Sequence, residues 1–196
     1  ADLLREMRRR DSLPDYFIGI NAGVRGPFLP TWAKSSLSFS AWHWTRAFIE
    51  KMRGPTDIRL VGTSIACLSS DDYCAQLDSK CSGPKVEGFA YAIEREALLA
   101  VLSHGVSFTG DARNKHEAVL AEYALSRTVL DNGWNIGALL VAYDGIDFRE
   151  RDEWQCNSHL FPSRAGKYYG ISISPFETIF HKSYWAKPEE PRAMAR

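Results

Sequence analysis

Apolar runs of strand length alternate with segments of helical periodicity along most of this 196-residue chain. Strands are expected at residues 16–20, 58–68 and 86–93, and the clearest helix at residues 115–130. This alternation predicts an α/β fold with a mixed sheet flanked by helices. The strand runs are apolar on both faces, which is typical of central strands, so we expect these side chains in the core: Phe17, Ile18, Ile20, Leu60, Val61 and Ile65.

The charge balance argues against one large class of partners. Lys plus Arg number 24 and Asp plus Glu number 24, so the formal net charge is zero. A dedicated nucleic-acid binder normally carries a basic excess that displaces counterions from phosphates. No apolar run approaches the roughly 18 residues of a membrane helix, so no membrane segment is expected within this chain.

Common catalytic signatures are missing from the sequence. It contains no GxSxG, no Walker loop, no GxGxxG and no HExxH. An unrelated hydrolase or nucleotide-binding module is therefore disfavoured. The four cysteines have no zinc-ligand spacing and are too scattered for a disulfide scaffold. The spacing of Cys74 and Cys81 allows a loop-closing disulfide, but both thiols could equally stay free.

The loop that follows the first strand run carries the most promising polar groups. Ligands of open α/β sheets bind beyond the carboxyl ends of the strands. Asn21 and Arg25 lie in this loop, and an arginine can pair bidentately with a phosphate. Its glycines, Gly26 among them, let a ligand approach the backbone closely. The alternative is a tight structural turn with a solvated arginine.

A series of segments resembles a known family. They are YFIGINAGVRGPFLP, WHWTRAFIEKM, IRLVGTSIACL, VEGFAYAI, EYALSRTVLDNGWNIGALL and ISPFETIFHK, in this order. The series resembles the later part of a GT-A-type, nucleotide-sugar-dependent glycosyltransferase, with the nearest likeness to poorly characterised hexosyltransferase homologues and a looser one to rhamnan-synthesis proteins. The resemblance covers residues 16–182. It implies one glycosyltransferase-like domain over residues 1–186 and a polar tail over 187–196.

The resemblance also implies a GT-A-like fold with an abbreviated or missing front part. GT-A enzymes grip the nucleotide with a βαβα unit ahead of the metal loop. About 15 residues precede the first strand run here, whereas one βαβ unit takes roughly 30. The N-terminal nucleotide-binding unit is therefore expected to be shortened or absent.

The implied activity is transfer of a hexose or deoxyhexose from a nucleotide-sugar donor to a glycan acceptor, as in polysaccharide biosynthesis. The alternative is a catalytically inactive relative with a glycan-binding or structural role. A eukaryotic member of this family would work in the Golgi or secretory lumen. This polypeptide by itself is expected to transfer sugar slowly or not at all.

The family's metal loop departs from its pattern in this sequence. GT-A enzymes hold Mn or Mg with an Asp-x-Asp motif, but the matching position reads Asn21-Ala22-Gly23 and has no carboxylate. Three interpretations stay open: a metal-independent transferase, a metal held elsewhere, or a catalytically dead relative. In the first case Arg25 would supply part of the charge that stabilises the leaving diphosphate.

The resemblance assigns roles to further residues. Glu122 matches the acidic residue of a YExGxS pattern, and it or Asp111 would deprotonate the acceptor hydroxyl. The alternatives are a solvated or helix-capping carboxylate for Glu122 and a turn residue or N-terminal helix cap for Asp111.

Near the last strand run, His181 would bind a metal and Lys182 the diphosphate, although a histidine there is often structural. Trp44 would stack on a sugar, unless it belongs to the core. The expected substrate-binding set is Asn21, Arg25, Gly26, Trp44 and Lys182.

Overall fold

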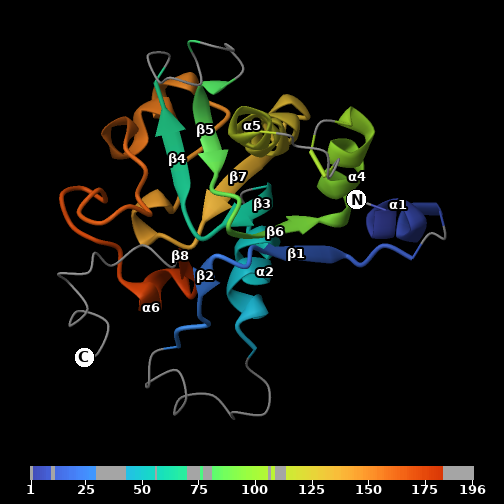
Figure 1. Cartoon of the computed structure of the whole chain (residues 1–196), viewed down its shortest axis with the longest axis horizontal. Coiled ribbons are helices and arrows are strands. Elements are labelled where there is room, and N and C mark those ends of the chain that lie inside the picture. Colours follow the sequence, from blue (N-terminus) through green and yellow to red (C-terminus); the bar gives the residue numbers. More distant parts are fainter. Residues whose placement is uncertain are drawn as a thin grey trace.

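The fold is organised around a four-stranded mixed sheet with the order β1-β6-β3-β7. In the computed structural model, the described residues are 2–9, 12–29, 43–55, 57–69, 76, 81–105, 107–108 and 114–182. The strands are β1 (Tyr16–Ile20), β3 (Ile58–Gly62), β6 (Ala90–Glu94) and β7 (Asn135–Ala138). β6 runs antiparallel to both β1 and β3, whereas β3 and β7 are parallel. The carboxyl ends of β1, β3 and β7 therefore lie along one edge of the sheet (Figure 1).

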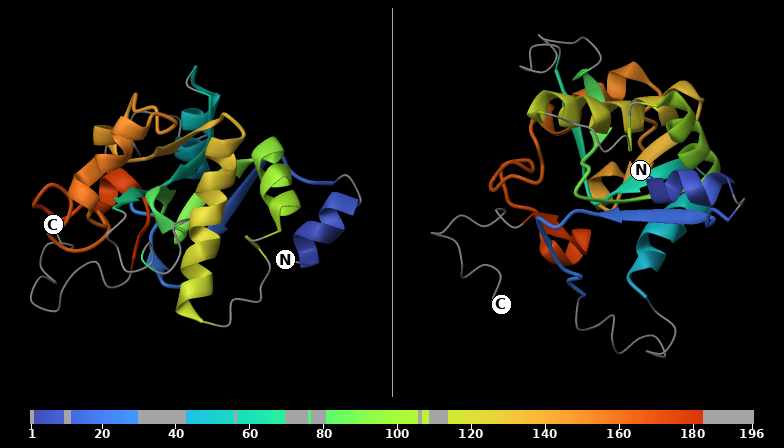
Figure 2. Two further views of the ribbon diagram at one scale, coloured as in Figure 1. Left: turned by 90° about the horizontal axis from the view of Figure 1, so that it is seen from above. Right: turned by 45° about the vertical axis from the view of Figure 1, so that its right-hand side comes forward.

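Helices cover both faces of this sheet (Figure 2). α2 (Thr45–Arg53) packs Phe48 and Met52 on one face, where Val61 and Ala92 point. Leu60 and Ile93 point to the opposite face, which is covered by α1 (Asp2–Arg9), α4 (Arg95–His104) and α5 (Lys115–Asp131). The predicted α/β class with a mixed sheet flanked by helices is confirmed.

The helix ends follow local signals in the sequence. α4 ends at Gly105, whose left-handed backbone (φ 77°) caps the helix with an N–H bond to Val101 O. α5 begins after Asn114, whose side chain accepts a hydrogen bond from the Glu117 N–H at 2.9 Å. None of the described helices has the length and apolar character needed to cross a bilayer.

Two apolar runs that were each expected as one strand are broken in the structure. Residues 58–68 divide into β3 and β4 (Ile65–Leu68), and residues 86–93 divide between β5 (Gly83–Val86) and β6. β4 and β5 form an antiparallel hairpin that leaves the main sheet. Every residue from 60 to 68 is buried on both sides, so no polar alternation marks the break.

The prediction that the first strand run lies at the centre of the sheet is wrong. β1 is an edge strand, so Phe17 and Ile18 are only half-buried and Ile20 is 44% exposed. Leu60, Val61 and Ile65 are fully buried, as expected. An apolar run with no alternation cannot by itself distinguish an edge strand from a central one.

A disulfide joins two distant parts of the chain. Cys67 in β4 is bonded to Cys156 in η4 (Arg151–His159), a 3-10 segment. Cys81 is also disulfide-bonded, and Cys74, with which its spacing would allow a bridge, lies outside the described residues. Disulfides such as Cys67–Cys156 are typical of proteins from oxidising compartments.

Candidate functional site

Polar groups gather at the edge formed by the carboxyl ends of β1 and β3. The Asn21 N–H at the end of β1 donates to Phe89 O at 2.8 Å, and the Thr63 N–H after β3 donates to Ala90 O at 3.1 Å. The Glu87 N–H donates to Ser64 O at 3.1 Å. Residues 87–89, which link β5 to β6, therefore cross this edge directly in front of the ends of β1 and β3.

Glu87 lies at the centre of this edge. Its side chain is fully buried, and its carboxylate accepts hydrogen bonds from the Ser64 and Ser163 hydroxyls, both at 2.6 Å. The Lys182 ammonium lies 3.4 Å from the oxygen that also accepts from Ser163. A buried carboxylate is costly unless it is paired and hydrogen-bonded, and here donors from three separate segments satisfy it.

Lys85 forms a second buried ionic contact, with Glu122 of α5. The two side chains are ion-paired, with Lys85 almost completely buried and Glu122 partly exposed. The ammonium also lies 5.5 Å from the ring centroid of Tyr123 and 5.4 Å from that of Phe161. These aromatic faces compensate part of the lost hydration of the cation. The Glu122 carboxylate is thus fixed at one side while its remaining surface faces solvent.

Gly88 allows Glu122 to approach the backbone. A Cβ atom at this position would lie 2.9 Å from Glu122 Oε1 and 3.1 Å from its Cγ. Tyr91 in β6 lies on the same side, and its pKa is raised by burial and, to a lesser extent, by the Glu122 carboxylate. The small size of the glycine thus lets the carboxylate pack closely against the backbone, and its backbone is not left-handed.

The loop after β1 and the end of the described chain form one unit. β2 (Val24–Arg25) pairs antiparallel with β8 (His181–Lys182), so that Arg25 lies opposite His181 and Val24 opposite Lys182. Gly26 follows with φ 139°, and a Cβ there would collide with Ile179 O. Four expected site residues, Arg25, Gly26, His181 and Lys182, are thus brought together, while Asn21 is tied to the same edge.

His181 is 1% exposed, and burial lowers its pKa to about 4. The Glu87 carboxylate and a hydrogen bond with the Lys182 backbone oppose this shift, whereas the charge of the Lys182 side chain adds a smaller contribution to it. The imidazole is therefore neutral at physiological pH. Arg25, its neighbour across the strand pair, is exposed to solvent and is the cation of this unit that a ligand could reach most easily.

The donor set around this loop does not fit a divalent metal. Asn21 Oδ1 accepts a hydrogen bond from the Gly23 N–H at 2.6 Å, so the amide closes an Asx turn. The Glu87 oxygens are taken by serines and a lysine. Within the part of the chain that the structure describes, no three His, Cys, Asp or Glu residues are grouped as metal ligands would be. His181 as a metal ligand therefore finds no further ligands among the described residues.

One other expected site residue, Trp44, is a packing contact, and Asp111 cannot be compared with the site. Trp44 packs edge-on against Phe180, with ring centroids 4.9 Å apart, and against Phe48 at 6.3 Å. It is thus a core contact beneath the residue that precedes His181. Asp111, the second candidate base, lies outside the described residues.

Sequence reasoning missed the residues at the centre of the site. Glu87 and Gly88 fall within the run expected as one strand, Lys85 lies just before it, and neither serine, Ser64 nor Ser163, is singled out by the sequence. A signal was present, since Lys85 and Glu87 are charged residues in a stretch that is otherwise apolar. Charged side chains are almost never fully buried unless they are paired.

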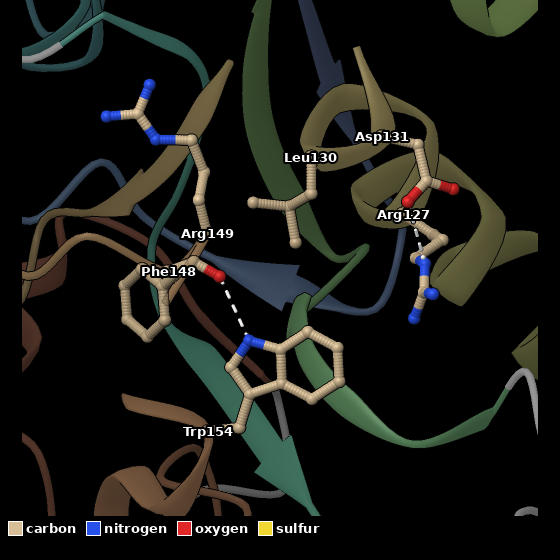
Figure 3. Close-up of a pocket in the computed structure, with 6 residues that line it drawn as sticks. All are labelled: Arg127, Leu130, Asp131, Phe148, Arg149 and Trp154. Carbon is tan, nitrogen blue, oxygen red and sulfur yellow. Dashed lines mark hydrogen bonds and ion pairs between the residues drawn. The ribbon is translucent and has the colours of Figure 1, made fainter. Parts of the chain in front are cut away.

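A small cavity of about 150 Å³ lies away from this edge (Figure 3). It is lined by Arg127, Leu130, Asp131, Phe148, Arg149 and Trp154. The Trp154 Nε1–H donates to Phe148 O at 3.0 Å, and Arg127 pairs with Asp131 and lies over the indole. The Phe148 N–H binds the side chain of Asn135, the first residue of β7. The cavity therefore lies near the opposite edge of the sheet, and its charged side chains are already paired, since Arg127 binds Asp131 and Arg149 binds Asp147.

Comparisons with known proteins add no assignment to this geometry. No protein-family model matches the sequence, and no curated protein and no solved structure is significantly similar to it.

Proposed function

We propose that this chain is a GT-A-like glycosyltransferase domain that transfers a hexose or deoxyhexose from a nucleotide sugar to a glycan acceptor. One observation carries the proposal: the pairing of β2 with β8. The resemblance assigns the diphosphate of the donor to the loop after the first strand and to the basic residue after the last one. These two segments are neighbours at the carboxyl edge of the sheet, where ligands of such sheets bind.

In this proposal Arg25 and Lys182 hold the diphosphate. Arg25 is exposed beside the loop, and Lys182 is fixed by Glu87 and lies 5.2 Å over the ring of Phe89. Two cations near the leaving group stabilise the negative charge that develops on it as the sugar departs. The Asn21 side chain is already used in a turn and so does not fit a metal ligand at this loop. The two cations are therefore more important for stabilising the charge on the diphosphate.

Glu122 is the candidate general base of the transfer. Its carboxylate is held by Lys85 and lies against Gly88, with part of its surface open to solvent. A base must reach the proton that it removes and must keep its orientation while doing so. Its proton would come from the acceptor hydroxyl that attacks the anomeric carbon.

Titration with uridine and guanosine diphosphate, each with and without Mn²⁺, tests the donor half. Arg25→Ala and Lys182→Ala should each weaken binding by about 1.5–3 kcal/mol, as expected for a charge-assisted contact. Arg9→Ala is the matched control, because Arg9 pairs with Glu6 on α1, far from this edge. Unchanged affinity in both site variants would contradict the proposed diphosphate site.

A second candidate is a catalytically inactive glycan-binding domain. The carboxylate-free turn at Asn21 favours it, because the usual metal ligands of the family are replaced there. Binding of a saccharide together with no binding of either nucleoside diphosphate would select this candidate. Sugar transfer that is lost in Glu122→Gln would exclude it.

A further inference from the structure

Three exposed apolar side chains lie near the carboxyl end of β7, next to a buried tyrosine and a glutamate. We call this group the tyrosine platform and define it as the exposed Val141, Tyr169 and Ile171, with the buried Tyr168 and the carboxylate of Glu177. Val141, Tyr169 and Ile171 are 66%, 59% and 64% exposed, although each is a large apolar or aromatic residue. Each is thus available for contact with a ligand.

Hydrogen bonds and ring contacts hold the members of the platform together. Tyr168 and Ile171 exchange two backbone hydrogen bonds, at 2.9 and 3.0 Å, and the rings of Tyr168 and Tyr169 lie 5.1 Å apart. The Val141 N–H donates to Glu177 Oε1 at 3.0 Å. Burial, and then the nearby Glu177 carboxylate, raise the pKa of the Tyr168 hydroxyl. The Glu177 carboxylate therefore lies beside Val141 and close to the Tyr168 hydroxyl.

The turn that presents Tyr169 is built at a cost in backbone energy. Tyr169 has φ 48°, a left-handed conformation that residues with a large side chain rarely adopt. A buried side chain, Asn157, holds it there: Oδ1 accepts from the Tyr169 N–H at 2.9 Å, while Nδ2 donates to Leu160 O and Lys167 O. Strained positions that are held by their surroundings concentrate at ligand sites.

A core tyrosine, Tyr143, connects the platform to the candidate site. Tyr143, the last residue of the short helix that starts at Val141, packs edge-on against Tyr168 at 6.4 Å. The pKa of Tyr143 is raised by burial and, to smaller degrees, by Tyr169, Tyr168 and the Glu87 carboxylate. The Tyr143 ring therefore contacts the platform and lies within electrostatic reach of Glu87. Val141 follows the end of β7 by three residues, so the platform lies at the same carboxyl edge of the sheet as the candidate site.

We infer that the tyrosine platform is the subsite that binds a saccharide, namely the glycan acceptor; this inference rests on the proposed function. A pyranose ring presents C–H groups on its faces and hydroxyls around its rim. The exposed face of Tyr169 matches the C–H groups, and the Glu177 carboxylate can accept hydrogen bonds from the hydroxyls. The platform is thus matched to a sugar in both respects.

A protein partner fits this surface less well. Stable protein interfaces use roughly 20–30 residues on each side, and their cores are depleted in glutamate. The platform has five residues, and a glutamate is one of them. Its size suits one or two sugar rings instead.

Saturation-transfer NMR and titration of the full chain test this inference. The probes are methyl glycosides of glucose, galactose, mannose and rhamnose, with cellobiose, maltose and lactose. We expect at least one probe to bind and Tyr169→Asn to weaken it at least tenfold. Asparagine tolerates the left-handed backbone, so this variant removes the ring and keeps the turn. Tyr169→Phe keeps the ring and should bind within about threefold of wild type. The matched control is Tyr16→Ala, which removes a half-buried tyrosine at the start of β1, the edge strand on the side of the sheet opposite to β7. It should also bind within about threefold of wild type.

Three results would overturn the inference: no probe binds to the wild type, Tyr169→Asn binds as tightly as wild type, or the chain forms a dimer that Tyr169→Asn dissociates. The nucleoside-diphosphate titration separates this inference from the proposed function. Saccharide binding that depends on Tyr169, without any diphosphate binding, would support the saccharide site at the platform and contradict the proposed glycosyltransferase activity. Diphosphate binding that depends on Arg25, with saccharide binding independent of Tyr169, refutes the platform alone.

Discussion

Ser64 and Glu87 are joined by a 2.6 Å hydrogen bond across the point where the β4–β5 hairpin leaves the main sheet. The Glu87 N–H also donates to Ser64 O, so the two residues are linked through both side chain and backbone. Ser163 and Lys182 reach the same carboxylate from the C-terminal third of the chain. Glu87 therefore connects the sheet edge to the segment that carries β8, and through it to Arg25.

Replacement of Glu87 by alanine should destabilise the fold strongly. It would leave two buried serine hydroxyls and the Lys182 ammonium without their acceptor, at an expected cost of about 3–5 kcal/mol in the free energy of unfolding. Urea denaturation measures this cost. Glu50→Ala is the control, because it removes an exposed carboxylate paired with Arg46 and should cost less than about 1 kcal/mol. Equal losses in the two variants would show that Glu87 does not hold these segments together.

Stability should rise with pH between about 4 and 6.5 because of His181. Burial lowers its folded-state pKa to about 4, below the ordinary value of 6.5. In this window the unfolded chain binds the proton more readily than the folded one, so its contribution is complete above pH 6.5 and is lost as the pH falls to about 4. The slope is at most about 1.4 kcal/mol per pH unit.

Urea midpoints at several pH values, compared between wild type and His181→Gln, measure this slope. The exposed His43, changed to glutamine in the same way, is the matched control. The variant at His181 should have the shallower dependence, whatever its absolute stability. Identical slopes for wild type and His181→Gln would contradict the assignment.

Local signals in the sequence mark the ends of the helices α4 and α5. Gly105 ends α4 and Asn132 caps the end of α5, at the positions where the sequence has glycine or asparagine after an apolar stripe. These caps depend on a few neighbouring residues, so they can be recognised without knowledge of the tertiary fold.

The breaks at residues 63–64 and 87–89 could not be predicted in this way. Both segments are almost entirely buried, because the β4–β5 hairpin is covered by α5 and by η4. Burial on both sides removes the alternation that would mark a strand end. The site residues Ser64 and Glu87 lie in these breaks, which is why they were overlooked.

The long-range contacts of the site have no local signal either. The resemblance suggested Arg25 and Lys182 separately, but their proximity depends on the pairing of β2 with β8. Likewise, the separation of 89 residues between Cys67 and Cys156 matches no recognisable spacing pattern.

Two isoleucines distinguish the centre of the sheet from its edge. Ile93 in β6 is fully buried between β1 and β3, whereas Ile20 at the end of β1 is 44% exposed. Ile93→Ala should cost about 2–5 kcal/mol through loss of contacts and formation of a cavity. Ile20→Ala removes the same atoms and should cost less than about 1 kcal/mol, since it leaves no enclosed cavity. Similar losses on thermal or urea unfolding would mean that β1 is more deeply covered than the sheet order indicates.

Gly88 and Glu122 should be energetically coupled. Gly88 does not have a left-handed backbone, so Gly88→Ala introduces a methyl group without backbone strain. That methyl would lie 2.9 Å from Glu122 Oε1, so the carboxylate that pairs with Lys85 must shift. We expect a loss of about 1–3 kcal/mol in the free energy of unfolding, typical of overpacking.

The double variant isolates this contact from other effects of the methyl group. In a Glu122→Ala background the clashing atoms are gone, so Gly88→Ala should cost at least about 0.5 kcal/mol less there than in the wild type. Coupling energies between residues in contact are roughly 0.5–3 kcal/mol. The four proteins of the cycle are compared by urea denaturation under one set of conditions. Additive losses would show that Gly88 is needed for some other reason, and that the position of the candidate base does not depend on it. A clear coupling would instead tie the orientation of Glu122 to the same Lys85–Gly88 segment that holds Glu87.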